Sequence, residues 1–349
     1  MQLADRIALL ARLGDYLRSK DERLEAVIHR TSFTNLWFTK ENQWKAVEAI
    51  AEQWLRSEKL EQWLSRYEIP PETDAKKVGL VLAGNIPLVG FHDVVSVFAT
   101  GHKAVIKLSE KDPYLLPFLV KVITEMDGRA APYFRFVDRL EGFDAVIATG
   151  SNNSSRYFEA YFGKYPHIIR KNRNGIAILT GAETPEELAA LGEDIFRYFG
   201  LGCRNVSKLY VPEGYDFEPL METLHEYRQI VLHDKYRNNF DYNTAIAMLN
   251  KTAYLSNGCL VLMEDPGIVS PIAAAYYQFY SDIETVEKEI LERSEEIQLV
   301  TARPGVLSSP TLPFGTAQEP ALWDYADGVD TVAFLLGCNS GGNLKLPPE

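Results

Sequence analysis

The chain has 349 residues, of which 46% are hydrophobic and 24% are charged, and its formal net charge is −12. This length and composition are typical of a soluble globular protein with two domains. The negative charge argues against nucleic acid as a partner, and no apolar run approaches the ~18 residues that a membrane-spanning helix needs. The N-terminus predicts an amphipathic helix with acidic residues rather than a signal peptide, so we expect a cytoplasmic protein.

The first 69 residues predict a helical region. Apolar side chains recur at helical spacing in two stripes, one over residues 7–17 and one over residues 44–54. Trp44 and Trp54 belong to the second stripe, and we interpret them as residues of a core or of a domain contact. Pro70 and Pro71 end this region.

Strands and helices then alternate along the chain. The segments that predict strands are residues 78–85, 104–113, 134–137 and 144–151. The segments that predict helices are residues 88–100, residues 115–126 and a stretch from Ser151 through Tyr161. Alternation of this kind predicts a doubly wound α/β sheet, which binds its ligands at the carboxyl ends of its strands.

Polar groups suited to a cofactor follow three of these strands. They are Asn85, then Lys107 with Ser109 and Glu110, and finally the turn Thr149, Gly150 and Ser151. The usual dinucleotide fingerprint, GxGxxG, is absent, so a Rossmann site of the usual kind is not supported. Each group also has a structural interpretation: Asn85 as a turn residue, Lys107 as a solvated lysine, and Gly150-Ser151 as a helix N-cap.

One cysteine lies on a turn bounded by glycines. Residues 185–199 predict a helix, with Thr184 as its N-cap, and residues 207–211 predict a short strand. Cys203 sits between them, after Gly200 and Gly202. A thiolate there could attack an acyl carbon, and its own N–H could hold the resulting oxyanion. The alternative is that Cys203 is a small buried hydrophobic residue, which is the commoner role of a lone cysteine.

The other cysteines and the histidines give no further site. Three cysteines without a CxxC pair predict neither a zinc site nor a disulfide framework, and they indicate a reducing compartment. None of the six histidines lies at metal-ligand spacing from a cysteine or from another histidine. We therefore expect no metal.

The segment around Cys203 resembles the nucleophile segment of the aldehyde dehydrogenase superfamily. That segment reads G-x-x-C, a variable triplet, and then S-[RK]-L-[FY]-V, and residues 200–211 fit it without a gap. The resemblance implies that Cys203 is the nucleophile, that Asn85 is the asparagine of W-N-F-P, and that Lys107 contacts the adenosine ribose. It also implies that Ser109 and Glu110 belong to that cofactor segment, and that Thr149, Gly150 and Ser151 flank the pyrophosphate and nicotinamide. Glu264 resembles the glutamate that holds the nicotinamide ribose, although its spacing differs by about two residues.

One departure from the superfamily concerns the general base. The dehydrogenases carry E-L-G-G-K before the cysteine, and its glutamate activates the water that hydrolyses the thioester. The corresponding residues here are 170–175, RKNRNG, which include no carboxylate. The thioester would then not be hydrolysed efficiently, which suits a reductase.

Several segments together resemble the acyl-CoA reductases related to the fatty acid reductase of bacterial luminescence, the Lux-type family. They are residues 84–113, 148–158, 170–179 and 313–331. The resemblance implies NADPH as cofactor, a long-chain acyl-CoA or an acyl-donor protein as partner, and reduction to the aldehyde. We also expect a homo-oligomer. Two alternatives stay open: a reductase of another activated acid, such as an acyl phosphate, and a nucleotide-binding scaffold without catalysis.

The fold class that follows is α/β and aldehyde-dehydrogenase-like, with two doubly wound domains and a helical N-terminal region. We expect residues 1–178 to form the helical region and the cofactor domain, residues 179–314 the cysteine domain, and residues 315–349 a return segment and tail. Within the cysteine domain, residues 219–229 predict a helix, residues 243–250 and 258–265 predict strands, and residues 284–296 predict a charged helix.

Overall fold

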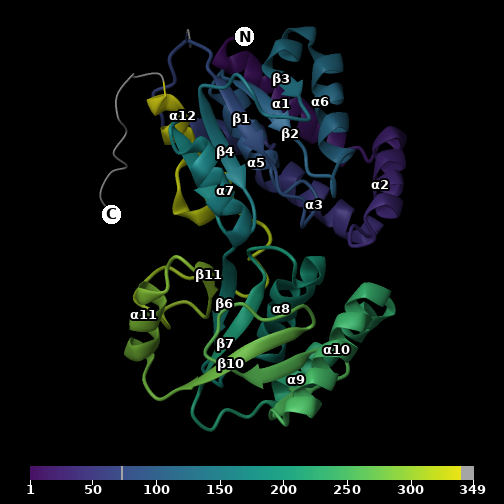
Figure 1. Cartoon of the computed structure of the whole chain (residues 1–349), viewed down its shortest axis with the longest axis vertical. Coiled ribbons are helices and arrows are strands. Elements are labelled where there is room, and N and C mark those ends of the chain that lie inside the picture. Colours follow the sequence, from purple (N-terminus) through teal and green to yellow (C-terminus); the bar gives the residue numbers. More distant parts are fainter. Residues whose placement is uncertain (72–73, 339–349) are drawn as a thin grey trace. The chain divides into compact units, whose positions relative to one another are not determined.

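The computed structural model describes residues 1–71 and 74–338. The chain splits into two compact units, one formed by Met1–Lys171 together with the segment from Pro320 onward, and one formed by Asn172–Glu319. Each unit contains one sheet with helices packed on it (Figure 1). Of the return segment and tail expected at residues 315–349, residues 339–349 lie outside the described residues.

The first unit is built on a parallel sheet of five strands in the order β3-β2-β1-β4-β5. The strands are β1 (Lys77–Val81), β2 (Lys103–Lys107), β3 (Phe134–Phe136), β4 (Ala145–Thr149) and β5 (His167–Arg170). The inner residues of β1, β2 and β4 are buried, which is why these strands are continuous apolar runs in the sequence. β1 ends four residues earlier than predicted, at Val81.

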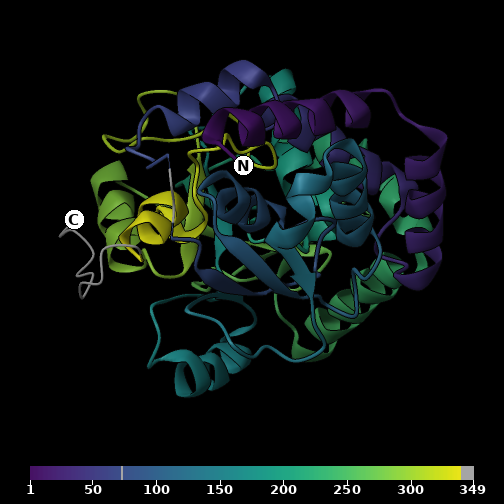
Figure 2. The same ribbon diagram turned by 90° about the horizontal axis from the view of Figure 1, so that it is seen from above.

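Helices cover both faces of this sheet. Those between the strands are α5 (Phe91–Ala99), α6 (Leu115–Met126) and α7 (Asn152–Phe162). The predicted helical N-terminal region consists of α1 (Leu3–Arg18), α2 (Glu22–Thr34), α3 (Lys40–Gln53) and α4 (Ser57–Leu64). α1 contacts α3, α4, α5 and α6, and Figure 2 shows α7 on the opposite face of the sheet.

The segment that returns to the first unit is anchored by aromatic side chains of the N-terminal helices. The Trp54 indole N–H donates to the Pro320 carbonyl at 2.7 Å, and the Trp63 indole N–H donates to the Tyr325 hydroxyl at 2.7 Å. The segment then forms α12 (Thr331–Gly337), which packs on α5. The predicted packing role of Trp54 is therefore confirmed.

The second unit contains six strands in the order β11-β6-β7-β10-β9-β8. They are β6 (Asn174–Ile178), β7 (Val206–Pro212), β8 (Tyr254–Ser256), β9 (Val261–Glu264), β10 (Ala274–Tyr280) and β11 (Ile297–Thr301). All pairs are parallel except β8 with β9. Figure 1 shows α11 (Ile283–Glu292) on one face and α8 (Pro185–Phe196), α9 (Glu218–His225) and α10 (Asp234–Asn250) on the other.

The unit boundaries differ from the expected positions at 178 and 314. β6 belongs to the second unit because it lies between β7 and β11 in the second sheet. On the other side, the Asp194 carboxylate accepts hydrogen bonds from the backbone N–H of Gly315 at 2.7 Å and from that of Ala317 at 3.0 Å. These bonds hold the turn after residue 312 in the second unit, so the return begins at Pro320.

The strand expected at residues 243–250 is wrong, because these residues form the second half of α10. The buried residues of α10 are Tyr236, Asn243 and Ala247, which share one helical face. Several of the remaining apolar residues, such as Met248 and Leu249, are exposed. Two other helices are shorter than expected, since α9 ends at His225 and α11 at Glu292.

None of the helices in residues 1–71 and 74–338 is both long enough and apolar enough to cross a membrane.

Candidate active site

The polar residues that follow β1, β2 and β4 lie at one edge of the first sheet. β1 is the middle strand of the three and pairs in parallel with both β2 and β4. Their carboxyl ends therefore meet at one edge. Lys107 and Thr149 are the last residues of β2 and β4, and Asn85 lies in the loop after β1. Because β2 and β4 lie on opposite sides of β1, the strand order reverses there, and such a switch point is where open α/β sheets bind ligands.

The loops after β1 and β2 pack tightly on each other. A Cβ atom placed on Gly84 would lie 2.5 Å from the Ser109 hydroxyl oxygen, so only glycine fits beside Ser109 without a shift. Lys107 and Glu110 are exposed, and Asn85 and Ser109 are partly buried. The sheet edge therefore presents an ammonium group, a hydroxyl and an amide, a donor set that suits ribose and phosphate oxygens.

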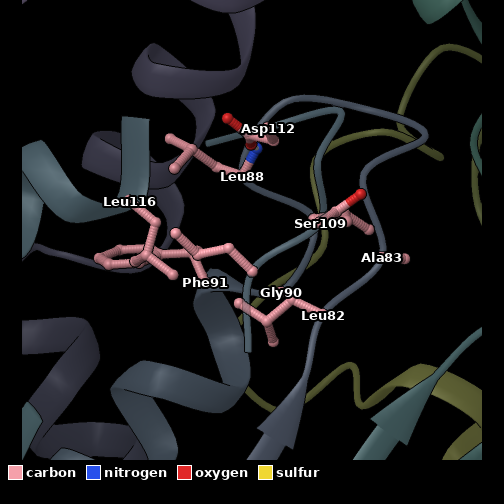
Figure 3. Close-up of a pocket in the computed structure, with 10 residues that line it drawn as sticks. Leu82, Ala83, Leu88, Gly90, Phe91, Ser109, Asp112 and Leu116 are labelled. Carbon is pink, nitrogen blue, oxygen red and sulfur yellow. Dashed lines mark hydrogen bonds between the residues drawn. The ribbon is translucent and has the colours of Figure 1, made fainter. Parts of the chain in front are cut away.

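A small hollow lies between these two loops, and Leu82, Leu88, Ser109 and Asp112 are among the residues that line it (Figure 3). The Asp112 carboxylate is buried and accepts a hydrogen bond from the backbone N–H of Leu88 at 3.0 Å. Burial raises the pKa of Asp112 to about 6, against the opposing effect of the backbone N–H groups of Leu88 and Leu115. No motif in the sequence marks Asp112, and its one local signal is an acidic residue before Pro113 at the end of the strand predicted over residues 104–113.

The turn after β4 caps a helix. The Ser151 hydroxyl oxygen accepts from the backbone N–H of Ser154 at 3.2 Å and is the N-cap of α7. The predicted N-cap role is therefore confirmed, and it does not conflict with cofactor binding. The N-terminus of a helix presents backbone N–H groups and a partial positive charge, which suit a phosphate.

Cys203 lies in the turn between α8 and β7, as predicted. α8 begins with a capping box, in which Thr184 and Glu187 each bond the other's backbone N–H. After α8, the consecutive residues Tyr198, Phe199 and Gly200 have φ angles of 55°, 60° and 74°. Bulky residues rarely adopt this left-handed conformation, and it is found where the surrounding structure imposes it, often at functional sites.

The three thiols differ in their surroundings. Cys203 and Cys338 are partly buried and Cys259 is fully buried. Burial raises the pKa of Cys259 to about 12 and that of Cys338 to about 11. Because the thiolate is the nucleophile, these two cysteines are poor candidates for chemistry near neutral pH.

The stretch without a carboxylate, residues 170–175, crosses the boundary between the units. An exposed basic face is the usual role of such a run, but Arg170 is buried at the end of β5. Its guanidinium contacts the Asp93 carboxylate at 2.6 Å and donates to the Thr331 hydroxyl at 3.0 Å. The nearby Arg173 donates to the Ser294 carbonyl at 3.0 Å.

The candidate residues are divided between the two units. Asn85, Lys107, Ser109, Glu110, Thr149, Gly150 and Ser151 belong to the first unit, and Cys203 and Glu264 belong to the second. Glu264 is exposed and ends β9. Among the described residues, no group of three or more histidine, cysteine, aspartate or glutamate side chains is placed to hold a metal ion.

Comparison with known proteins identifies a distant relative. No protein-family model matches the chain. The long-chain acyl-protein thioester reductase 2 of Photobacterium leiognathi is 24% identical over 213 residues, which cover 55% of this chain and 44% of the relative. The match thus spans less than half of the relative's length. The chain is a distant homologue of that reductase.

Solved structures that resemble the chain include aldehyde dehydrogenases and an oxidoreductase. Aldehyde dehydrogenase 21 from Physcomitrella patens, in complex with the reaction product succinate, matches with a TM-score of 0.70 at 14% identity over 97% of this chain and 85% of that chain. An oxidoreductase from Marinobacter aquaeolei gives 0.65 at 12% identity over 86% and 73% of the two chains. A mutant of aldehyde dehydrogenase C from Pseudomonas syringae, in complex with NAD⁺ and octanal, gives 0.61 at 11% identity over 86% and 72%. The predicted aldehyde dehydrogenase fold is confirmed.

Proposed function

We propose that this chain is an NADPH-dependent reductase that converts a long-chain acyl thioester to the aldehyde through a covalent thioester on Cys203. The observation that carries the proposal is the position of Cys203. Cys203 is partly buried and lies on the turn between α8 and β7, just after the left-handed residues 198–200, in a chain distantly homologous to an acyl-protein thioester reductase. The acyl donor is acyl-CoA or an acyl-protein.

The chemistry requires two transfers at one carbon atom. The Cys203 thiolate attacks the acyl carbonyl carbon, a thioester forms on Sγ, and the thiolate of the donor leaves and takes up a proton. NADPH, when bound, supplies the hydride that reduces this carbonyl carbon. The Cys203 sulfur then leaves as a thiolate, which frees the aldehyde and restores the enzyme. The Asn85 amide and the Cys203 N–H stabilise the oxyanion in both steps.

The residues that hold the nucleotide in this proposal come mainly from the edge of the first sheet. Lys107, Ser109 and Glu110 bind the adenosine ribose, and Thr149, Gly150 and Ser151 bind the pyrophosphate at the start of α7. The fit rests on the loops packed together at Gly84 and on the N-terminus of α7. In the second unit, Glu264 binds the nicotinamide ribose.

The test is intact mass spectrometry after the protein is mixed with acyl-CoAs of graded length, without nucleotide. We expect a mass increase equal to one acyl group, its loss on addition of NADPH, and the appearance of aldehyde. Cys203→Ala should form no acyl-enzyme but should bind NADPH with nearly unchanged affinity, and Cys259→Ala is the matched control. Wild-type rates of acyl-CoA reduction by Cys203→Ala would refute the assignment. Acylation by an acyl phosphate but not by any acyl-CoA would favour the other reductase.

A further inference from the structure

We propose that Asn205 is a positioning residue for the nucleophile. Its side chain ties the turn on which Cys203 lies to the end of α8. The inference rests on the proposed function, since it assumes that the Cys203 thiol reacts. It is carried by hydrogen bonds within the second unit. Asn205 matches no motif in the sequence, because it lies in the variable triplet after the cysteine.

The Asn205 side chain is 1% exposed and uses both ends of its amide. Its oxygen accepts a hydrogen bond from the backbone N–H of Gly202 at 2.8 Å. Its nitrogen donates to the carbonyl of Arg197 at 2.7 Å and to that of Asp194 at 3.0 Å, with a longer contact of 3.4 Å to the carbonyl of Ile195.

The backbone of Asn205 closes the same turn. Its N–H donates to the Gly202 carbonyl at 3.1 Å, and its carbonyl accepts from the Gly175 N–H, at the start of β6, at 2.9 Å. Cys203 therefore lies within a four-residue turn, residues 202–205, that Asn205 closes through both its side chain and its backbone.

This network supplies hydrogen-bond partners for backbone groups at the end of α8 and in the turn on which Cys203 lies. The last carbonyl groups of a helix have no partner within the helix, and the Asn205 amide nitrogen donates to that of Asp194 and contacts that of Ile195 near the end of α8. The left-handed residues Tyr198 and Phe199 persist only if the chain on both sides is held. Fixing the Gly202 N–H and the end of α8 to one side chain holds that chain, and with it the direction of the Cys203 Cα–Cβ bond.

Loss of this side chain should impair acylation more than it impairs folding or nucleotide binding. Without the amide, the Gly202 N–H and the α8 carbonyls lose a buried partner, and the turn can relax. A displacement of about 1 Å at a reacting group can lower the rate about 10²-fold. The first sheet, which carries most of the proposed nucleotide residues, makes no contribution to this network.

The experiment compares Asn205→Ala and Asn205→Asp with a matched control, Asn243→Ala. Asn243 is also a buried asparagine of the second unit and lies on α10. Its amide nitrogen donates to the Ile272 carbonyl at 2.7 Å. Four quantities are measured: the rate of acyl-enzyme formation from palmitoyl-CoA, the pH profile of Cys203 alkylation by iodoacetamide, the NADPH dissociation constant and the melting temperature. Peptide mass spectrometry assigns the alkylation to Cys203.

We expect Asn205→Ala to lower the acylation rate by about 10²-fold and to shift the alkylation profile, with an NADPH dissociation constant within about threefold of wild type. Asn243→Ala should lower the melting temperature comparably and leave both Cys203 readouts unchanged. Asn205→Asp keeps the acceptor for Gly202 but turns a second oxygen toward the α8 carbonyls, so it should also acylate slowly. If Asn205→Ala does not fold, Asn205→Asp is the variant that tests the proposal.

Wild-type acylation and alkylation by either Asn205 variant would overturn the proposal, and so would equal changes in the Asn243 control. If the wild-type protein forms no acyl-enzyme, the proposed function fails while the alkylation profile still tests Asn205. A normal Cys203 alkylation profile in Asn205→Ala would then refute the positioning role separately.

Discussion

The Asp112 carboxylate and the backbone N–H of Leu88 form a buried hydrogen bond of 3.0 Å across 24 positions of the chain. Leu88 has a φ angle of 56°, in the left-handed region. The bond joins the loop after β1, which carries Asn85, to the loop after β2, which begins directly after Lys107. The proposed oxyanion donor and the proposed ribose ligand therefore belong to one connected structure at the sheet edge.

The first prediction concerns the pH dependence that Asp112 contributes to stability. Because its folded-state pKa is raised from 3.8 to about 6, the folded state binds more protons than the unfolded state between about pH 4 and pH 6. The contribution of this carboxyl group to the free energy of unfolding is therefore fully present below pH 4 and is lost as the pH rises through 6. A pKa change from 3.8 to about 6 corresponds to about 3 kcal/mol.

Asp112→Asn removes this titration. We expect the variant to become more stable relative to wild type by up to about 3 kcal/mol between pH 4 and pH 7. The measurement is urea unfolding at four pH values across that range. Asp241→Asn, at an exposed position of α10, is the control. A difference between Asp112→Asn and wild type that does not vary with pH would contradict the prediction.

The second prediction concerns Asn85. If its amide stabilises the oxyanion, Asn85→Ala should lower turnover by about 10²–10³-fold, the usual effect of losing one such donor. The affinity for acyl-CoA should change little, because the donor acts on charge that develops in the transition state. Single-turnover kinetics separates the two effects, with Asn250→Ala at the exposed end of α10 as the control. Equal losses in binding and turnover would mean that Asn85 positions the substrate instead.

The third prediction concerns the choice of nucleotide. Lys107 is exposed at the end of β2, where a cation beside the ribose would favour the 2′-phosphate of NADPH. Hydrogen bonds to charged groups contribute about 1.5–3 kcal/mol, so Lys107→Gln should weaken NADPH binding about tenfold or more. NADH binding should weaken less. Fluorescence titration of both nucleotides tests this, with Lys121→Gln on the exposed side of α6 as the control. Equal losses of affinity for NADPH and NADH would contradict a role of Lys107 in selecting the nucleotide.

Local signals in the sequence were sufficient for most of the fold. Thr184 as N-cap and Pro185 at the first helical position predict the start of α8, and the apolar runs predict the parallel strands. The prediction failed at residues 243–250, where exposed apolar residues on α10 obscured the helical face. It also placed β6 in the wrong unit, because only long-range pairing determines which sheet a strand joins.

The residues that support the site could not be predicted from the sequence, again because their partners are distant in the chain. Asp112 and Asn205 act on backbone atoms rather than on side chains, and their partners lie 24 and up to 11 positions away. Any residue type can supply a backbone N–H or carbonyl group, so no motif marks the partner. The sequence motifs identified the residues proposed to touch the substrate and the nucleotide, and the structure was needed to find those that hold them.

The last prediction concerns the fate of the acyl-enzyme. A dehydrogenase hydrolyses its thioester with a carboxylate that activates water, and residues 170–175 include none. The structure also removes Arg170 from consideration, because it is buried against Asp93 at 2.6 Å. Arginine stays protonated at neutral pH, and an asparagine amide has no useful basicity. Deacylation by water should therefore be slow relative to hydride transfer or to return of the acyl group to CoA.

Two results follow for the wild-type protein. The acyl-enzyme should accumulate when NADPH is withheld, and oxidation of a long-chain aldehyde with NADP⁺ should need free CoA as the acyl acceptor. The measurement supplies the aldehyde and NADP⁺ with and without CoA and follows NADPH formation beyond the first turnover. Without CoA we expect a burst of no more than one equivalent per Cys203, since each thioester blocks its own enzyme. Sustained turnover to free fatty acid in the absence of CoA would falsify the reductase mechanism, because it would require a general base elsewhere in the chain.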